Sequence, residues 1–138
     1  MSTVVRSELS TRNKYYISKH RYYELKHYCL QYPEWVKAYT DLCNYGLTSN
    51  CCYQKYDLNA GDPTGKIATA KAELWQKMEH LKSVCKETDE QLWMYIFEAV
   101  TKGYSFTYLK MTLEMPAEKN MYYDRYRRFF WLLSRSHC

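Results

Sequence analysis

Glycine and proline are scarce in this chain of 138 residues, which holds only four glycines and three prolines. β-Sandwiches with many tight turns need more of both residues, and so do disordered linker proteins, so the sequence argues against both classes. Hydrophobic residues make up 46% of the chain, which is enough for a buried core. The frequent Lys, Glu, Leu, Ala and Met favour helices in a single compact domain.

Long hydrophobic runs are also missing. No stretch of 18 uncharged apolar residues is present, so the sequence predicts no membrane-spanning helix and no membrane partner. The first ten residues lack the hydrophobic centre of a signal peptide, and we therefore expect a cytoplasmic protein. In that compartment the six cysteines are expected to be reduced thiols.

Signatures of catalysis and of metal binding are absent as well. The segment GDPTGK (residues 61–66) lacks the four-residue spacer of a phosphate-binding loop, and no signature supports a Cys–His nucleophile pair. Cys29, Cys43 and the adjacent Cys51 and Cys52 have no Cys-x-x-Cys spacing, which tetrahedral zinc sites favour. We therefore expect no enzyme activity, no catalytic residue, no metal site and no cofactor.

Tyrosine, by contrast, is abundant, with 16 residues. Its apolar ring and polar tip suit half-buried helix faces and interfaces, which would allow a homodimer. Charge is uneven, with a net +4 in residues 1–30, −3 in residues 31–101 and +4 in residues 102–138. Two basic ends favour a surface that faces a polyanion, although ordinary solvated helix faces would give the same totals.

Apolar residues recur at spacings of three and four, so the sequence predicts an all-α fold of five or six helices. Residues 1–43 are predicted to form a basic and aromatic helical hairpin, with a helix from about Asn13 that is broken at Pro33. Residues 44–62 break the periodicity and are interpreted as a loop. Residues 63–138 are expected to hold a long helix that begins at Pro63, followed by three helices.

The three C-terminal helices have characteristic lengths. A capping box of Thr88 and Gln91 is expected to open the first, and a left-handed Gly103 to end it. A short helix with Leu109 and Leu113 facing inward comes next. A tight turn at residues 114–116, with Met115 in its corner, leads to a longer helix over residues 117–134. A short helix, a turn and a long helix form the layout of a helix-turn-helix DNA reader, although a helical hairpin that only packs would share it.

The last helix would present one apolar side and one charged side. Its first half offers groups for base edges, and its second half offers arginines for phosphates. Glu118 and Asp124 would repel phosphate unless they pair with Arg125 and Arg128. The predicted DNA-binding residues are Ser105, Lys110, Lys119, Asn120, Tyr123, Arg125, Arg127 and Arg128.

Two stretches of the sequence resemble the small phage late transcription regulators of the RinA/ArpU type. They are DPTGKIATAKAE (residues 62–73) and GYSFTYLKMTLEMPAEKNMYYDRYRRFFWLL (residues 103–133). The resemblance covers about half of the chain, and Pro116 stands where the family usually has Ser or Thr. It implies a helix-turn-helix similar to region 4 of sigma factors, double-stranded DNA and host RNA polymerase as partners, and the cytoplasm of a bacterial host.

Two alternatives remain open. One is a small phage-encoded helical interaction module that inhibits or adapts a host nucleic-acid enzyme, which Glu118, Asp124 and the acidic middle of the chain would suit. Residues 12–28 interleave five Lys/Arg with five tyrosines, a pattern that suits RNA or single strands. Those tyrosines could equally pack on the long helix from Pro63 while the basic side chains point to solvent. The accessory nucleic-acid contacts to test are Lys14, Lys19, Arg21 and Lys26.

Overall fold

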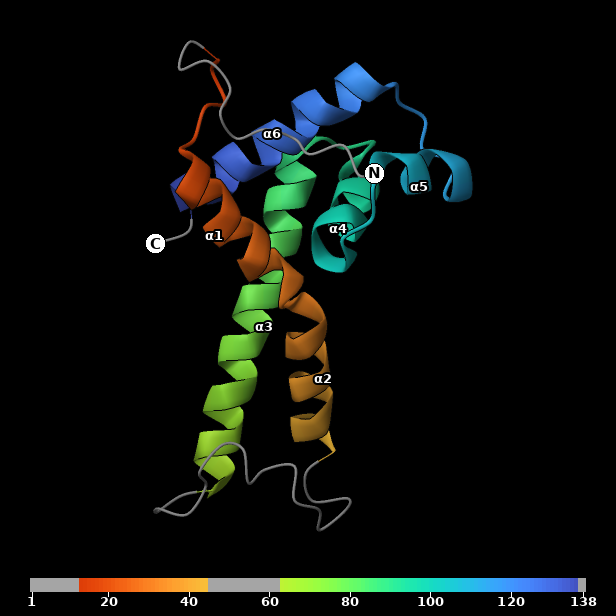
Figure 1. Cartoon of the computed structure of the whole chain (residues 1–138). Helices are drawn as coiled ribbons and strands as arrows, with labels where there is room; N and C mark the ends of the chain where they lie inside the picture. Colours follow the sequence, from red (N-terminus) through yellow and green to blue (C-terminus); the bar gives the residue numbers. More distant parts are fainter. Residues whose placement is uncertain (1–12, 45–62, 137–138) are drawn as a thin grey trace. The chain divides into compact units, whose positions relative to one another are not determined.

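The computed structural model describes residues 13–44 and 63–136 of the chain. Within these residues the fold contains six helices and no strand, which confirms the predicted all-α class and helix number (Figure 1). Most of the predicted loop, with Cys51 and Cys52, lies outside the described residues. The helices are α1 (Lys19–Leu30), α2 (Tyr32–Cys43), α3 (Pro63–Thr88), α4 (Trp93–Lys102), α5 (Phe106–Thr112) and α6 (Lys119–Ser136).

The chain divides into two compact units, and α3 contributes to both. Unit 1 comprises Met1–Gln31 and Leu81–Cys138, and unit 2 comprises Tyr32–His80. In unit 1, α6 lies across α1, and α1 also contacts α4 (Figure 1). The core of this unit is aromatic: the ring of Tyr22 on α1 lies edge-on to Phe130 of α6 at 5.1 Å, and Phe129 and Tyr122 of α6 are buried beside them.

The first helix begins later than the sequence predicts, at Lys19 and not near Asn13. The Asn13 side chain accepts a hydrogen bond from the backbone N–H of Tyr15 (2.8 Å) and holds a turn. Asn and Ser compete in this way with helical hydrogen bonding, which is why they favour turns and caps. Ser18 is the N-cap, and its hydroxyl accepts from the N–H of Arg21 at 3.3 Å.

The helix is interrupted near Pro33, but Tyr32, the residue before the proline, is already helical, and the loop of a helical hairpin is not found there. Gln31 alone separates α1 from α2, and its backbone stays right-handed (φ −77°, ψ −9°). Helical hairpins are joined by loops of about two to five residues. Pro33 lies in the first turn of α2, where its missing N–H costs no hydrogen bond.

The capping box predicted at Thr88 and Gln91 is wrong. Thr88 is the last residue of α3, and its hydroxyl donates back to the carbonyl of Val84 at 2.8 Å. Asp89 instead holds the turn that leads into α4: its Oδ1 accepts from the N–H groups of Gln91 (2.8 Å) and Leu92 (2.9 Å), and Leu92 is the N-cap of α4, without a side-chain capping bond. Gly103 ends α4 in the left-handed conformation (φ 76°), as predicted.

The connection from α5 to α6 agrees with the prediction only in part. Leu109 and Met115 are buried as expected, and the N–H of Met115 donates to the carbonyl of Leu109 at 3.1 Å. Leu113, however, is exposed (36%), because the chain leaves α5 there and turns through the positive φ (54°) of Glu114. The last helix begins at Lys119, two residues later than predicted, so six residues separate α5 from α6.

Unit 2 is an antiparallel pair made of α2 and the first part of α3. Leu42 and Ile67 form its small hydrophobic cluster, with Ala70 and Leu74 packed against them. Closer to the other end of the pair, the ring of Tyr39 lies 5.7 Å from that of Trp75. Nearer the start of α2, the ammonium of Lys77 lies 5.6 Å from the ring of Trp35, so the two helices run antiparallel.

Candidate nucleic-acid interface

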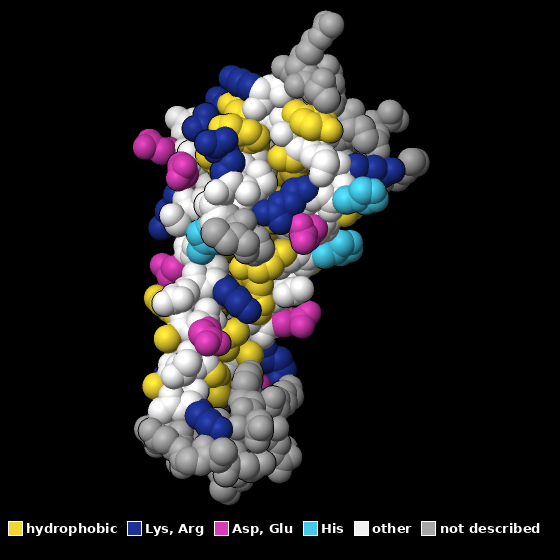
Figure 2. All heavy atoms as spheres, turned by 90° about the vertical axis from the view of Figure 1, so that its left-hand side faces the viewer, with side chains coloured by type: hydrophobic (Ala, Val, Ile, Leu, Met, Phe, Trp, Pro, Cys, Tyr) yellow, Lys and Arg dark blue, Asp and Glu magenta, His cyan; other side chains and the backbone are white. Residues whose placement is uncertain are grey.

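The outward face of α6 is the strongest candidate site on the described chain. The inward face holds the buried residues Tyr122, Phe129 and Leu133. At 3.6 residues per turn, the opposite side carries a polar stripe with three arginines. Lys and Arg side chains gather with hydrophobic ones over α1 and α6 on the side shown in Figure 2. The stripe consists of Asn120, Asp124, Arg127, Arg128, Trp131 and Arg135.

Arg127 and Arg128 are the predicted contacts that remain available. Both side chains are half-buried on α6, and no ion pair joins either of them to another described residue. Their Nε atoms are buried without a hydrogen-bond acceptor in the described part of the chain. Lys119 and Asn120 are exposed in the first turn of the helix. A guanidinium without a carboxylate partner keeps its capacity to bind phosphate.

Trp131 adds an aromatic contact that the sequence analysis did not single out. Its ring lies 5.7 Å from that of Tyr15, and the guanidinium carbon of Arg135 lies 4.8 Å from its centroid. The ammonium of Lys14 lies 5.0 Å from the Tyr15 ring. The i,i+4 spacing of Trp131 and Arg135 could have indicated their pairing, but the contact with Tyr15 joins residues far apart in the sequence.

Tyr123, predicted to contact base edges, faces the interior. Its side chain is buried, with the ring 5.2 Å from Tyr122 and 6.0 Å from Phe106. It lies about 100° around the helix from Tyr122, close enough to the apolar stripe to be covered by α5. The side chain is therefore a packing element and is not available at the surface.

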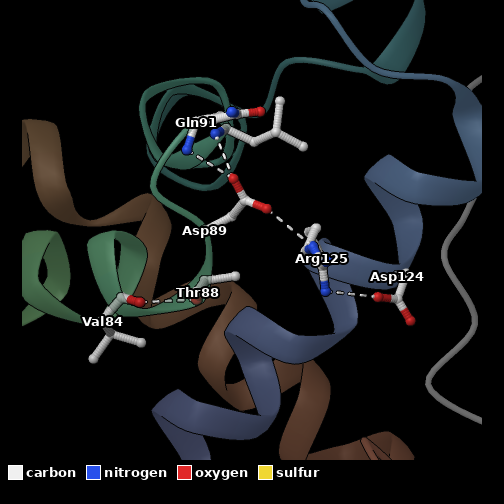
Figure 3. A network of polar contacts seen from close by, with 7 residues as sticks. Val84, Thr88, Asp89, Gln91, Asp124 and Arg125 are labelled. Carbon is white, nitrogen blue, oxygen red and sulfur yellow. Dashed lines mark hydrogen bonds and ion pairs between the residues drawn. The ribbon is translucent and has the colours of Figure 1, made fainter.

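Arg125, predicted to bind phosphate, is held by two carboxylates (Figure 3). Its Nε lies 3.0 Å from Oδ2 of Asp89, and its Nη1 donates to Oδ2 of Asp124 at 3.1 Å. Asp124 therefore pairs with Arg125 and not with Arg128, and the predicted Glu118–Arg125 pair is also wrong. Because both carboxylates neutralise Arg125, this side chain stabilises the docking of α6 and is poorly suited to a phosphate.

Ser105 and Lys110 have roles within the fold. The Ser105 hydroxyl caps α5 by accepting from the N–H of Tyr108 at 3.2 Å. The Lys110 ammonium donates to the carbonyl of Ala117 at 3.0 Å and lies 3.7 Å from Oε1 of Glu118. These contacts hold the connection between α5 and α6, so neither group points freely into solvent.

The four accessory residues differ in their surroundings. Arg21 pairs with Glu24 at 2.6 Å and donates to the carbonyl of Ser134 at 3.4 Å, which ties α1 to α6. The ammonium of Lys26 lies 5.9 Å from the ring of Tyr23, and Lys19 is exposed at the start of α1. From the sequence, the tyrosines of this segment could have packed on the long helix that begins at Pro63. In the structure, Tyr15 and Tyr22 contact aromatic rings of α6.

Buried phenols and thiols beneath this face stay neutral. The hydroxyls of Tyr22 and Tyr126 lie 3.2 Å apart, and burial raises the pKa of both groups. Burial likewise raises the pKa values of the Cys29 and Cys85 thiols. Neutral groups of this kind serve packing and do not supply a thiolate nucleophile.

No protein-family model, curated protein or solved structure matches the chain. Among the described helices, none is long and apolar enough to cross a membrane. In residues 13–44 and 63–136, no group of three or more His, Cys, Asp or Glu side chains is placed to hold a metal ion.

Proposed function

We propose that this protein binds double-stranded DNA through the outward face of α6 and acts as a regulator of phage or prophage transcription. The observation that carries the proposal is the pair Arg127 and Arg128, which lie side by side on α6 without an ion-pair partner among the described residues. Lys119 and Asn120 at the exposed start of the same helix would reach base edges. The resemblance of residues 103–133 to sigma-factor region 4 supports a DNA-binding helix-turn-helix in this part of the chain and implies host RNA polymerase as a second partner.

Electrostatics on α6 are consistent with this proposal. Asp124 lies on the outward stripe and would repel phosphate, but its carboxylate is paired with Arg125 at 3.1 Å. That pairing reduces the repulsion without consuming Arg127 or Arg128. Arg135 extends the basic stripe by two turns beyond them, which suits a helix that follows a phosphate backbone.

The test is duplex DNA binding at several salt concentrations. Labelled DNA from upstream of the protein's own gene would be titrated with wild type and with Arg127→Ala/Arg128→Ala, at about 50 to 200 mM salt. If each arginine neutralises one phosphate, the slope of log affinity against log salt should shrink by about two units in the double variant.

A matched control removes two positive charges elsewhere. Lys37 and Lys102 are each paired with a carboxylate on their own helix, at 3.4 Å and 2.8 Å. Lys37→Ala/Lys102→Ala should therefore leave the salt slope unchanged. An equal loss in both double variants would mean that net charge alone drives binding, and it would contradict the proposed site.

A second candidate function is the protein-interaction module that inhibits or adapts a host nucleic-acid enzyme. The observation that favours it is the exposure of apolar side chains on α5, where Met111 is 76% exposed and Tyr108 39%. Met-rich exposed surfaces are common at protein interfaces. Two results together would favour this candidate. Wild type would fail to bind DNA, and it would bind a host nucleic-acid enzyme that the Met111→Ser variant no longer binds.

A further inference from the structure

Unit 2 exposes an apolar flank that runs over both of its helices. Trp75 of α3 is 49% exposed and Val36 of α2 is 40% exposed, and Tyr39 lies half-buried against Trp75. Ala68 and Ala72, which lie seven and three residues before Trp75, are exposed as well. Hydrophobic side chains reach the surface over this part of the chain in Figure 2. A solvent-facing tryptophan beside small side chains is typical of an interface.

The interior of unit 2 is small for a helix pair. Its buried apolar side chains among the described residues are Trp35, Leu42, Ile67 and Met78, and Ala70 and Leu74 are only partly buried. Two helices bury one stripe each, whereas helical bundles enclose their cores with more helices. Small units of this kind commonly gain stability from oligomerisation. A further pair of helices on the exposed flank would bury Trp75 and Val36.

Charge along the flank is arranged for self-pairing. Lys71 and Glu79 lie four residues before and four residues after Trp75, so all three share one side of α3. The ammonium of Lys71 lies 5.7 Å from the ring of Tyr39, and Glu79 is exposed. If two copies of α3 cross antiparallel at Trp75, Lys71 of each copy meets Glu79 of the other.

We propose that the flank of unit 2 around Trp75 binds the same flank of a second copy, so that two antiparallel helix pairs form a four-helix dimer interface. A twofold axis requires a self-complementary surface, and the order Lys71, Trp75, Glu79 provides one. Ala68 and Ala72 leave room for the partner's Trp75. The interface lies entirely within unit 2 and is independent of the DNA-binding proposal, whose residues are all in unit 1.

The experiment measures mass in solution, by sedimentation or light scattering, over two decades of protein concentration. Wild type should have twice the 16.7 kDa mass of the chain. Trp75→Ala should dissociate to monomer while its helical circular dichroism is retained, because the side chain is half exposed. Met111→Ala, which truncates a more exposed apolar side chain in unit 1, is the matched control and should remain dimeric.

Charge exchange identifies the surface specifically. Lys71→Glu and Glu79→Lys should each weaken the dimer by at least about tenfold, because each places like charges opposite one another twice. The combined variant Lys71→Glu/Glu79→Lys restores opposite charges and should recover the dimer. A wild type that stays monomeric at every concentration would overturn the proposal. So would a Trp75→Ala variant that remains dimeric, or a combined variant Lys71→Glu/Glu79→Lys that stays monomeric.

Discussion

Asp89 shows how one side chain can serve both local and long-range structure. Its Oδ1 accepts the two N–H groups that open the turn before α4, and its Oδ2 holds Arg125 of α6 at 3.0 Å (Figure 3). The carboxylate side chain is only 14% exposed, which strengthens both interactions relative to a solvated surface pair. Loss of this residue would release both the turn that leads into α4 and the ion pair that docks α6.

Replacement of Asp89 should separate these two contributions. Asp89→Ala removes both and is expected to lower the free energy of unfolding by about 2 kcal/mol. Asp89→Asn should cost less, since the side-chain oxygen of asparagine can still accept the two N–H bonds of the turn but cannot form an ion pair with Arg125. Urea unfolding measures both changes, and Glu90→Ala at the exposed neighbouring position is the control. Equal losses in Asp89→Asn and Asp89→Ala would show that the hydrogen bonds to the turn contribute nothing.

Individual residues of α4, α5 and α6 show what the sequence can and cannot predict. Met115, Leu109 and Gly103 follow from local spacing and backbone preference, and the structure agrees with those predictions. The role of Arg125 does not follow, because its partner Asp89 lies 36 positions earlier in the chain. The fold class was therefore predictable from helical periodicity. The DNA contacts predicted at Arg127 and Arg128 stay predictions, and among the described residues no ion pair with a distant carboxylate removes them from consideration, as it does for Arg125.

At the scale of the helix, Gly103 determines where α4 stops. Its φ of 76° is left-handed, and its N–H donates to the carbonyl of Ala99 at 2.9 Å. A Cβ built on this residue would lie 3.7 Å from Cδ2 of Leu30, which is ordinary van der Waals contact. Only glycine adopts this backbone conformation without steric cost, so the requirement is conformational and does not come from crowding.

Gly103→Ala should therefore destabilise unit 1 by about 1 kcal/mol through its backbone alone. Gly103→Asn should cost less despite its larger side chain, because asparagine tolerates the left-handed region. Thermal unfolding followed by circular dichroism would rank the three proteins. A larger loss for asparagine than for alanine would instead indicate that space near Leu30 is the limiting factor.

At the scale of the whole molecule, the aromatic core makes stability sensitive to alkali. Burial raises the pKa values of Tyr22, Tyr122 and Tyr126 above the ordinary value of 10.0. Above pH 10 the unfolded chain releases phenolic protons that the folded chain still holds, so stability must fall as pH rises. Below that pH the phenols are protonated in both states, and their contribution is fully present.

We therefore expect the urea midpoint to decrease steeply between about pH 10 and 11 and to change little below about pH 9. The absorbance of tyrosinate, followed on the same samples, should show a group of phenols that ionises only as the protein unfolds. Tyr126→Phe should flatten part of the pH dependence, since it removes one buried titrating group. A midpoint that stays constant up to pH 11 would contradict this assignment.

The contacts between α1 and α6 also constrain when the protein can fold during synthesis. Tyr22 meets Tyr126 across 104 positions, and Arg21 meets the carbonyl of Ser134 across 113. A ribosome releases the chain from its N-terminus, so the part of α1 that packs on α6 stays uncovered until α6 has been synthesised. The helices of unit 2 are complete much earlier. Until α6 has been synthesised, the nascent chain would therefore leave the Tyr22 ring without its partners Tyr126 and Phe130.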